Sequence, residues 1–387
     1  MDRPRVLLAV TVFNGEPAVM RCLESVKRLD RAECDIDTVV LDDNSTDPGF
    51  SDRLQQRAHA LGFRCYSSPR NLGISRNANL GLLLAMEESY DYVLISNSDV
   101  VYPASAVTTM VECARANDRV GSVTAWSNNV SIYSLPNADP ASHLDEYVVD
   151  WAAVTLRREF GTEVIDIPAG VSFSMLMPVD VVSTVGLMDP VFGRGYCEGL
   201  DWSLRSKAAG YRSLLAPSTF VYHQGAASTE PPGVVDSGHA TTSANEAVIE
   251  MRHPSYRGDV AAFVASGVMP ATSERAARAL VQRAGHDNGY VVDVLQLDRP
   301  SADPRLVHCK IVQDDRGLTR ITAMYRGFAM STDAVAHLDA VTELRRLFDC
   351  DPERVRFFDR SPLTTALSNG FGTGTIIENA IMYPERV

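Results

Sequence analysis

Two oxygen-bearing side chains, Asn97 and Asp99, stand two residues apart directly after the apolar run from Tyr92 to Ile95. Such a run predicts a buried strand over residues 92–96. Side chains at positions i and i+2 of the following loop can face one point, as a divalent cation requires when carboxylates and substrate phosphates bind it. Asn, Ser and Asp also favour turns, and taken alone the tripeptide Asn97-Ser98-Asp99 predicts only a turn.

Three more polar clusters carry side chains suited to binding a nucleotide or an anion. The first is Asn14-Gly15-Glu16. In the second, Asp42-Asp43-Asn44-Ser45-Thr46-Asp47, Asp43 lies at the tip of a predicted strand and can hydrogen-bond a ribose or base, although Asp47 or Ser51 can simply cap a helix. The third, residues 70–77, has two arginines and a glycine before a predicted helix, where backbone amides attract anions. A loop with solvated arginines explains this last cluster equally well.

Alternating strands and helices must position these clusters. Apolar runs predict strands over residues 6–13, 36–41, 64–67 and 92–96, and amphipathic stretches predict helices over residues 17–28, 52–61 and 75–88. This order is typical of an α/β domain with a mostly parallel, Rossmann-like central sheet. Ligands bind such sheets outside the carboxyl ends of the strands, so we expect the polar clusters to share one pocket.

The rest of the chain predicts further elements and a second module. Strand-like segments cover residues 120–125, 171–178 and 220–222, and a helix over residues 199–209 precedes Gly210. Residues 137–143 look irregular, and residues 228–245 have a loop composition. We therefore predict a domain at 1–230, a linker and helical tail at 231–273, and a small α+β C-terminal domain at 274–387. The elements expected there are helices 274–284 and 332–348 and strands 290–297, 305–312 and 318–325.

Composition narrows the functional classes. The 387 residues predict two or three domains, and 45% hydrophobic residues suit a globular protein. A net charge of -13 disfavours binding to nucleic acid or anionic lipid, so a metal or a local basic patch must receive any phosphate. Seven scattered cysteines without a C-x-x-C pair argue against disulfides and zinc, and favour a cytoplasmic location. The apolar segment 6–13 is too short to be a transmembrane segment.

The ordered clusters together resemble the family 2 glycosyltransferases of the GT-A fold over about residues 4–228. The residues that carry this resemblance are Val12-Phe13-Asn14, Asp42-Asp43-Asn44-Ser45-Thr46-Asp47, Arg70-Asn71-Leu72-Gly73 with Arg76-Asn77, Asn97-Ser98-Asp99, Gly195-Tyr196-Cys197-Glu198-Gly199-Leu200-Asp201-Trp202-Ser203-Leu204-Arg205, Ala209-Gly210-Tyr211, Pro217 and Tyr222-His223.

The resemblance implies transfer of a sugar, with inversion, from a UDP- or dTDP-sugar donor to a hydroxyl-bearing acceptor. A divalent metal, Mn²⁺ or Mg²⁺, would be held by Asp99, and His223 would complete the metal or diphosphate site. The Asn-x-Asp motif resembles the rhamnosyltransferase branch, which implies dTDP-L-rhamnose as donor. The C-terminal domain is expected to bind acceptor, to pack over the site or to form a homo-oligomer. The residues implied in contacts with the nucleotide donor are Thr11, Phe13, Asn14, Asp43, Arg76 and Asn97.

The chain departs from the family pattern at two positions. Asn97 stands where an aspartate is common, so one metal-site charge is lost. Gly199 stands at the usual position of the catalytic base and cannot accept a proton. Glu198 and Asp201 share a helix face and are the candidates to replace it. Pairing with Arg205 is the alternative role for Asp201, and stabilisation of the helix N-terminus is the alternative for Glu198.

Three functional classes remain open. The main hypothesis is the glycosyltransferase. The loss of an acidic residue at Gly199 favours a sugar-nucleotide-binding protein without transfer activity, and a nucleotidyltransferase would also use a metal and a doubly wound sheet. His223 can instead be a satisfied buried histidine. Trp126 and Trp202 can stack on sugars, but large aromatic residues more often belong to the core.

Overall fold

The computed structural model describes two compact units. The described residues up to Pro270 form the first unit, and those from Ala271 onward form the second. The predicted irregular segment 137–143 and residues 228–242 of the predicted loop-like segment 228–245 lie outside the described residues. The expectation of a loop is wrong for residues 243–245, which begin a helix. The described residues are 3–135, 144–193, 196–225, 243–294, 305–313, 318–332, 335–336, 339–357 and 362–379.

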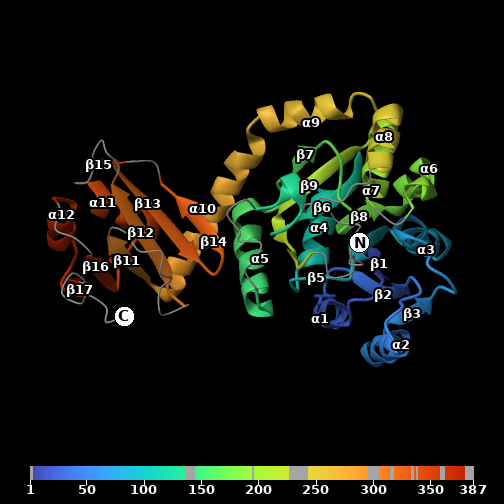
Figure 1. Ribbon diagram of the computed structural model, residues 1–387, viewed down its shortest axis with the longest axis horizontal. Coiled ribbons are helices and arrows are strands. Elements are labelled where there is room, and N and C mark those ends of the chain that lie inside the picture. The colour runs from blue at the N-terminus through green and yellow to red at the C-terminus, as the bar shows by residue number, and fades with distance from the viewer. Residues whose placement is uncertain are drawn as a thin grey trace. The chain divides into compact units, whose positions relative to one another are not determined.

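The first unit is built on an eight-stranded, mostly parallel sheet (Figure 1). Its strand order is β3-β2-β1-β4-β8-β6-β9-β7. The four strands β3, β2, β1 and β4 are parallel to one another, and β6 is parallel to β9. β8 is antiparallel to both its neighbours, and β7 is antiparallel to β9. The strands are β1 (Arg5–Val12), β2 (Asp35–Asp42), β3 (Arg64–Ser67), β4 (Tyr92–Asn97), β6 (Val120–Trp126), β7 (Ile165–Ile167), β8 (Ser174–Pro178) and β9 (Arg212–Phe220).

Helices connect these strands and cover both faces of the sheet. Successive side chains of a strand point to opposite faces, so Leu8 and Val10 of β1 join one apolar cluster while Leu7 and Ala9 join another. This double coverage is typical of parallel sheets. The α-helices of the first unit are α1 (Glu16–Lys27), α2 (Phe50–Leu61), α3 (Ile74–Glu87), α4 (Ala106–Arg115), α5 (Glu146–Phe160), α6 (Val179–Val185), α7 (Glu198–Ala208), α8 (Ser243–Arg252) and α9 (Tyr256–Ala265), and α10 (Val268–Asn288) begins there.

A short second sheet lies beside the carboxyl edge of the main one. β5 (Val100–Val101) pairs antiparallel with β10 (Tyr222–His223), and His223 is opposite Val100. This pairing brings the chain near residue 223 next to the loop that follows β4.

The second unit has a sheet of order β14-β13-β12-β11-β16-β17, with β15 paired to β13. It is an α+β module, as the sequence predicts. Its strands are β11 (Tyr290–Val294), β12 (Val307–Gln313), β13 (Leu318–Tyr325), β14 (Phe328–Ser331), β15 (Val335–Ala336), β16 (Arg354–Phe357) and β17 (Ile376–Asn379), and its helices include α11 (Ala340–Phe348) and α12 (Pro362–Gly370).

The predicted α/β class and the β-α-β-α-β-α-β order of the first third are confirmed. The expected helix over residues 332–348 is wrong in its first half, because Val335 pairs with Thr319 as a short strand. β9 is much longer than the segment expected at 220–222. Pro217 argues against a strand in the sequence, and the sheet accommodates it by a register irregularity between the Ala125–Ala216 and Trp126–Phe220 pairs. None of the described helices is both long and apolar enough to cross a membrane.

Gly81 of α3 allows the helix to lie close to the sheet. A Cβ atom at position 81 would lie 2.6 Å from the Cβ of Ala9 in β1 and 3.6 Å from side-chain atoms of Ile95 and Leu41. Carbon atoms do not approach to 2.6 Å without a shift of the backbone, because optimal contact is near ~3.5 to 4.0 Å. The spacing between α3 and β1 therefore depends on this glycine.

We predict that Gly81→Ala destabilises the protein by about 1–3 kcal/mol, because overpacking outweighs the roughly 1 kcal/mol gained in helix propensity. Urea and thermal unfolding measure the effect. The same substitution should cost less in an Ala9→Gly background, since the clashing methyl group is gone. Gly258→Ala in α9 is the matched control, because nothing lies within 4 Å of its added Cβ, and it should be neutral or stabilising.

Candidate active site

Three neighbouring strands end together at one edge of the main sheet. β1 pairs in parallel with both β2 and β4, so that Val12 lies opposite Asp42 and Thr11 lies opposite Asn97. The Thr11 hydroxyl is buried and donates to the carbonyl of Ser96 at 3.1 Å. The polar clusters that follow these strands therefore start from one edge, as the sequence predicts.

Asn14 ties the loop after β1 to the loop after β2. Its backbone is in the left-handed region, with φ of 55°. Its side-chain oxygen accepts hydrogen bonds from the backbone N–H groups of Thr46 at 2.7 Å and Asp47 at 3.2 Å, and its own N–H donates to the Ser45 hydroxyl at 2.8 Å. Phe13, just before it, is half-buried. The amide of Asn14 thus fixes the shape of this edge.

The carboxylate of Asp43 occupies the anion position at the N-terminus of α3. Its two oxygens accept hydrogen bonds from the backbone N–H groups of Leu72 at 2.6 Å and Gly73 at 2.9 Å. Gly73 has φ of 78° and directly precedes the helix. The sequence suggested that backbone amides before this helix bind an external anion. In the structure, the amides of Leu72 and Gly73 bind Asp43 instead, and this contact holds the loop. Arg70 and Arg76 are exposed at the same helix end.

Asp99 and His223 face each other across the junction of β4 and the short sheet. The Nε2 atom of His223 lies 3.2 Å from Oδ1 of Asp99, and both side chains are largely buried. Burial lowers the pKa of His223, but the hydrogen bond and the charge of Asp99 outweigh it, so the pKa is raised. Nδ1 lies 2.9 Å from the carbonyl of Asn129. A proton on Nδ1 satisfies this contact and leaves Nε2 directed toward Asp99.

The Asp99 and His223 pair is suited to a cation. In the tautomer with the proton on Nδ1, the lone pair of Nε2 faces a carboxylate oxygen, and this arrangement is stable only with a proton or a metal ion nearby. Two adjacent ligands of an octahedral ion lie about 3 Å apart, close to the observed 3.2 Å. The described residues contain no group of three His, Cys, Asp or Glu able to hold a metal. Other ligands would have to come from amides, water or substrate.

Phe173 and Ser172 connect this pair to the first turn of α7. The ring of Phe173 stacks on the imidazole of His223, with centroids 5.2 Å apart, and its carbonyl accepts from the N–H of Asn97 at 2.9 Å. The hydroxyl of Ser172 donates to Oε1 of Glu198 at 2.7 Å. Ser172 and Phe173 are consecutive residues, so their Cα atoms are about 3.8 Å apart. Glu198 and His223 therefore contact neighbouring positions of one loop.

Glu198 is buried at the N-terminus of α7, and only one of its carboxylate oxygens is satisfied. Oε1 accepts from Ser172, whereas Oε2 is buried without a hydrogen-bond partner among the described residues. An unsatisfied buried oxygen destabilises the folded state by roughly 1–3 kcal/mol. Oε2 can therefore accept a hydrogen bond that none of the described residues supplies.

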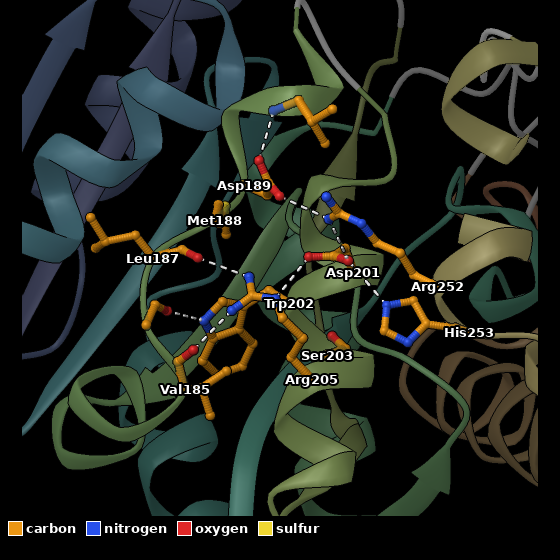
Figure 2. Close-up of polar contacts among 12 residues, drawn as sticks. Val185, Leu187, Met188, Asp189, Asp201, Trp202, Ser203, Arg205, Arg252 and His253 are labelled. Atoms are coloured by element: carbon orange, nitrogen blue, oxygen red, sulfur yellow. Dashed lines mark hydrogen bonds and ion pairs between the residues drawn. The ribbon is translucent and has the colours of Figure 1, made fainter. Parts of the chain in front are cut away.

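Asp201, one turn further along α7, is fully engaged (Figure 2). Its Oδ2 accepts from Arg205 at 2.8 Å, and its Oδ1 lies 3.0 Å from Nε2 of His253 and 3.4 Å from Arg252. Burial alone would raise the pKa of Asp201, but the hydrogen bonds from His253, Arg205 and Arg252 outweigh it and lower the pKa. This network holds the end of α8 against α7, and the predicted pairing with Arg205 is present.

Several residues of this region were missed in the sequence. Ser172 and Phe173 lie in an apolar stretch without a motif, and Arg252 and His253 lie far from α7 in the chain, so no local pattern marks them. Trp126 and Trp202 are fully buried, which confirms the core alternative for both. The N–H of Trp202 donates to the carbonyl of Gly186 at 2.8 Å.

Comparison with known families gives a match within the first unit. Residues 8–183 match the family model of glycosyl transferase family 2. This segment of the chain is therefore similar to a family 2 glycosyltransferase domain. The matched segment contains Thr11, Asp43 and Asp99 but ends before Glu198 and His223. No curated protein matches the sequence.

Solved structures similar to this chain have low sequence identity to it. GalNAc-T7, solved with UDP, GalNAc and Mn²⁺, is 14% identical over 57% of this chain and 44% of its own, with a TM-score of 0.45. The mannosyltransferase PcManGT from Pyrobaculum calidifontis, in complex with GDP-Man and Mn²⁺, is 17% identical over 75% and 77%, with a TM-score of 0.42. S. aureus TarS 1-349 is 13% identical over 57% and 60%, with a TM-score of 0.41. This chain thus spans less than half the length of GalNAc-T7.

We predict that Asp201→Asn lowers the stability of the first unit by about 2 kcal/mol, because it removes the charge that Arg205, Arg252 and His253 share. Thermal unfolding at neutral pH measures the loss. Glu250→Gln is the matched control, since its partner Arg257 is 75% exposed and exposed ion pairs contribute about 0–1 kcal/mol.

The stability gap between wild type and Asp201→Asn should depend on pH. Because the folded-state pKa of Asp201 is lowered, its contribution is complete above the unfolded value of about 3.9 and is lost as the pH falls through the folded value. Melting temperatures measured from pH 7 down to pH 3 should therefore converge below about pH 4. A constant gap over this range would contradict a charge-based role.

Proposed function

We propose that this glycosyltransferase moves a sugar from a UDP- or dTDP-sugar to an acceptor hydroxyl with inversion, with help from a divalent cation. The observation that carries the proposal is the contact of consecutive loop residues, Ser172 and Phe173, with Glu198 and His223 respectively. A cation-binding pair and a half-satisfied carboxylate are thereby held close together. Sugar transfer needs both groups, one near the leaving diphosphate and one near the attacking hydroxyl.

Asp99 and His223 would hold the cation. When bound, Mn²⁺ or Mg²⁺ would stabilise the negative charge that develops on the leaving diphosphate. A ligand pair that includes imidazole favours Mn²⁺, because Mg²⁺ prefers oxygen ligands alone. Asn97 contributes no charge, so the proposed site carries fewer negative charges than one with two aspartates. The diphosphate itself would supply further oxygen ligands.

Glu198 would act as the base. Its Oε2 takes the proton of the acceptor hydroxyl while the hydroxyl oxygen forms a bond to the anomeric carbon. The bond from that carbon to the diphosphate oxygen breaks, and its electron pair leaves with the diphosphate. A single displacement of this kind inverts the anomeric centre. Asp201 is a poor alternative, because taking up a proton would weaken its contacts with three basic side chains.

The edge of the sheet formed by β1, β2 and β4 would bind the nucleotide. Thr11, Phe13, Asn14 and Asn97 lie at or beside this edge, and Arg76 is exposed at the first turn of α3 with no carboxylate attached to it among the described contacts. Arg76 is suited to contact the base or diphosphate. Asp43, at the end of β2, would lie beside the ribose or base. dTDP-L-rhamnose is the first donor to test.

A sugar-nucleotide-binding protein without transfer activity is the second candidate. The specific observation in its favour is Gly199, which offers no side chain at the position that the family resemblance implies for the base. It differs from the main proposal in one respect only, since donor binding would occur without turnover.

We predict that UDP- or dTDP-sugars raise the melting temperature of the wild-type protein, and that Mn²⁺ increases this shift. Selective binding stabilises the folded state by about 2.7 kcal/mol at a ligand concentration 100 times Kd. Asp99→Asn should abolish the part that depends on Mn²⁺. A screen of nucleotide sugars by thermal shift, with Mg²⁺ and without metal as comparisons, tests this. A metal-dependent shift that survives in Asp99→Asn would contradict the proposed site.

We predict that Glu198→Gln lowers kcat for sugar transfer by about 10²–10⁴-fold, the usual contribution of a general base, and leaves the donor-induced thermal shift intact. Product analysis by mass spectrometry measures transfer. Glu250→Gln, the same chemical change on exposed α8, should retain wild-type activity. Full activity of Glu198→Gln would eliminate Glu198 as the base, and an inactive wild type that binds donors would favour the binding protein.

A further inference from the structure

We propose that Ser172 is a positioning residue that orients the Glu198 carboxylate for proton transfer, an inference that rests on the proposed function. Ser172 lies in the loop before β8 and donates its hydroxyl to Oε1 of Glu198 at 2.7 Å. A hydrogen bond to an ionised oxygen is stronger than one between neutral groups. With Oε1 engaged, rotation of the carboxyl group is restricted and Oε2 is left as the oxygen available to an acceptor.

The loop that carries Ser172 is held on several sides, so the hydroxyl has a defined position. The N–H of Gly170 donates to the Ser203 hydroxyl of α7 at 3.0 Å, and the N–H of Val171 donates to the Thr124 hydroxyl of β6 at 3.2 Å. On the other side of Ser172, the Phe173 carbonyl accepts from Asn97 at 2.9 Å. These bonds fix the loop to α7 and to two strands, and a fixed support orients a catalytic group more accurately than a free one.

Gly199 and Ser172 occupy complementary space. A Cβ atom at position 199 would lie 3.1 Å from both the Cβ and the Oγ of Ser172, which is tight for any side chain. The Ser172 hydroxyl therefore lies beside the point where a side chain at 199 would begin, and it also contacts Oε1 of Glu198. Glu198 precedes position 199 on the helix, and its long side chain brings its carboxylate to the same Ser172 hydroxyl.

The alternative is that Ser172 only satisfies a buried carboxylate. A structural role predicts a loss of stability without a change in kcat of the folded enzyme. A positioning role predicts a lower kcat at an unchanged donor KM, and recovery of kcat by a side chain that keeps the hydroxyl. The two roles are thus distinguished by kinetics and not by stability.

The experiment compares wild type, Ser172→Ala, Ser172→Thr and Ser203→Ala in the full chain with Mn²⁺ over a range of donor concentrations. Ser172→Ala should lower kcat about tenfold, the equivalent of roughly 1.4 kcal/mol, with the donor KM unchanged. Ser172→Thr keeps the hydroxyl and should restore kcat. Ser203→Ala disturbs the same loop without contacting Glu198, and it should lower kcat much less than Ser172→Ala does.

Two results would overturn the inference. One is a folded Ser172→Ala protein with wild-type kcat, while Glu198→Gln is inactive; the proposed function would then stand and only the role of Ser172 would fail. The other is an equal loss of kcat in Ser203→Ala, which would show a general effect of the loop. An active Glu198→Gln is a different failure, because it removes the base and hence the proposed function on which Ser172 depends.

Discussion

The parallel pairing of β1 with both β2 and β4 is the constraint on which the active site depends. Parallel strands in register end at the same edge, so the loops that follow them lie close together. Here the polar groups of these loops form hydrogen bonds with one another. Asn14 binds the amides of Thr46 and Asp47, and Asp43 binds the amides before α3. The edge is therefore shaped before any ligand arrives, which reduces the conformational entropy lost on binding.

The antiparallel strand β8 adds the second half of the site. Because β8 runs opposite to β4, the loop that precedes it lies at the carboxyl edge of β4. Phe173 and Ser172 at this position contact His223 and Glu198, which come from β10 and α7. A single reversed strand thus places Asp99, His223 and the Glu198 carboxylate, from distant parts of the sequence, around one loop. This geometry supports our proposal that these groups serve one reaction.

The sequence predicted the first half of this arrangement better than the second. Alternating apolar and amphipathic segments predict β1 to β4 and the edge that carries Thr11, Asp43 and Asp99, because periodicity reports burial directly. It did not reveal that Asp43 binds the backbone amides of Leu72 and Gly73 just before α3. Nor did it reveal that Arg252 and His253 reach Asp201, because these contacts join residues without a fixed spacing. β9 was largely missed for a different reason, since Pro217 is tolerated only through an irregularity in the strand pairing.

Glu198 and Asp201 show how environment separates two carboxylates within one turn of a helix. Helical spacing puts them on one face, yet Asp201 contacts Arg205, Arg252 and His253 while the described contacts give Glu198 a neutral hydroxyl alone. A carboxylate held by cations resists protonation, so it is suited to anchoring α8. One that lacks a cationic partner and keeps an oxygen without a hydrogen bond is suited to receive a proton. The difference in partners, more than the position along α7, supports our proposal that Glu198 accepts the proton.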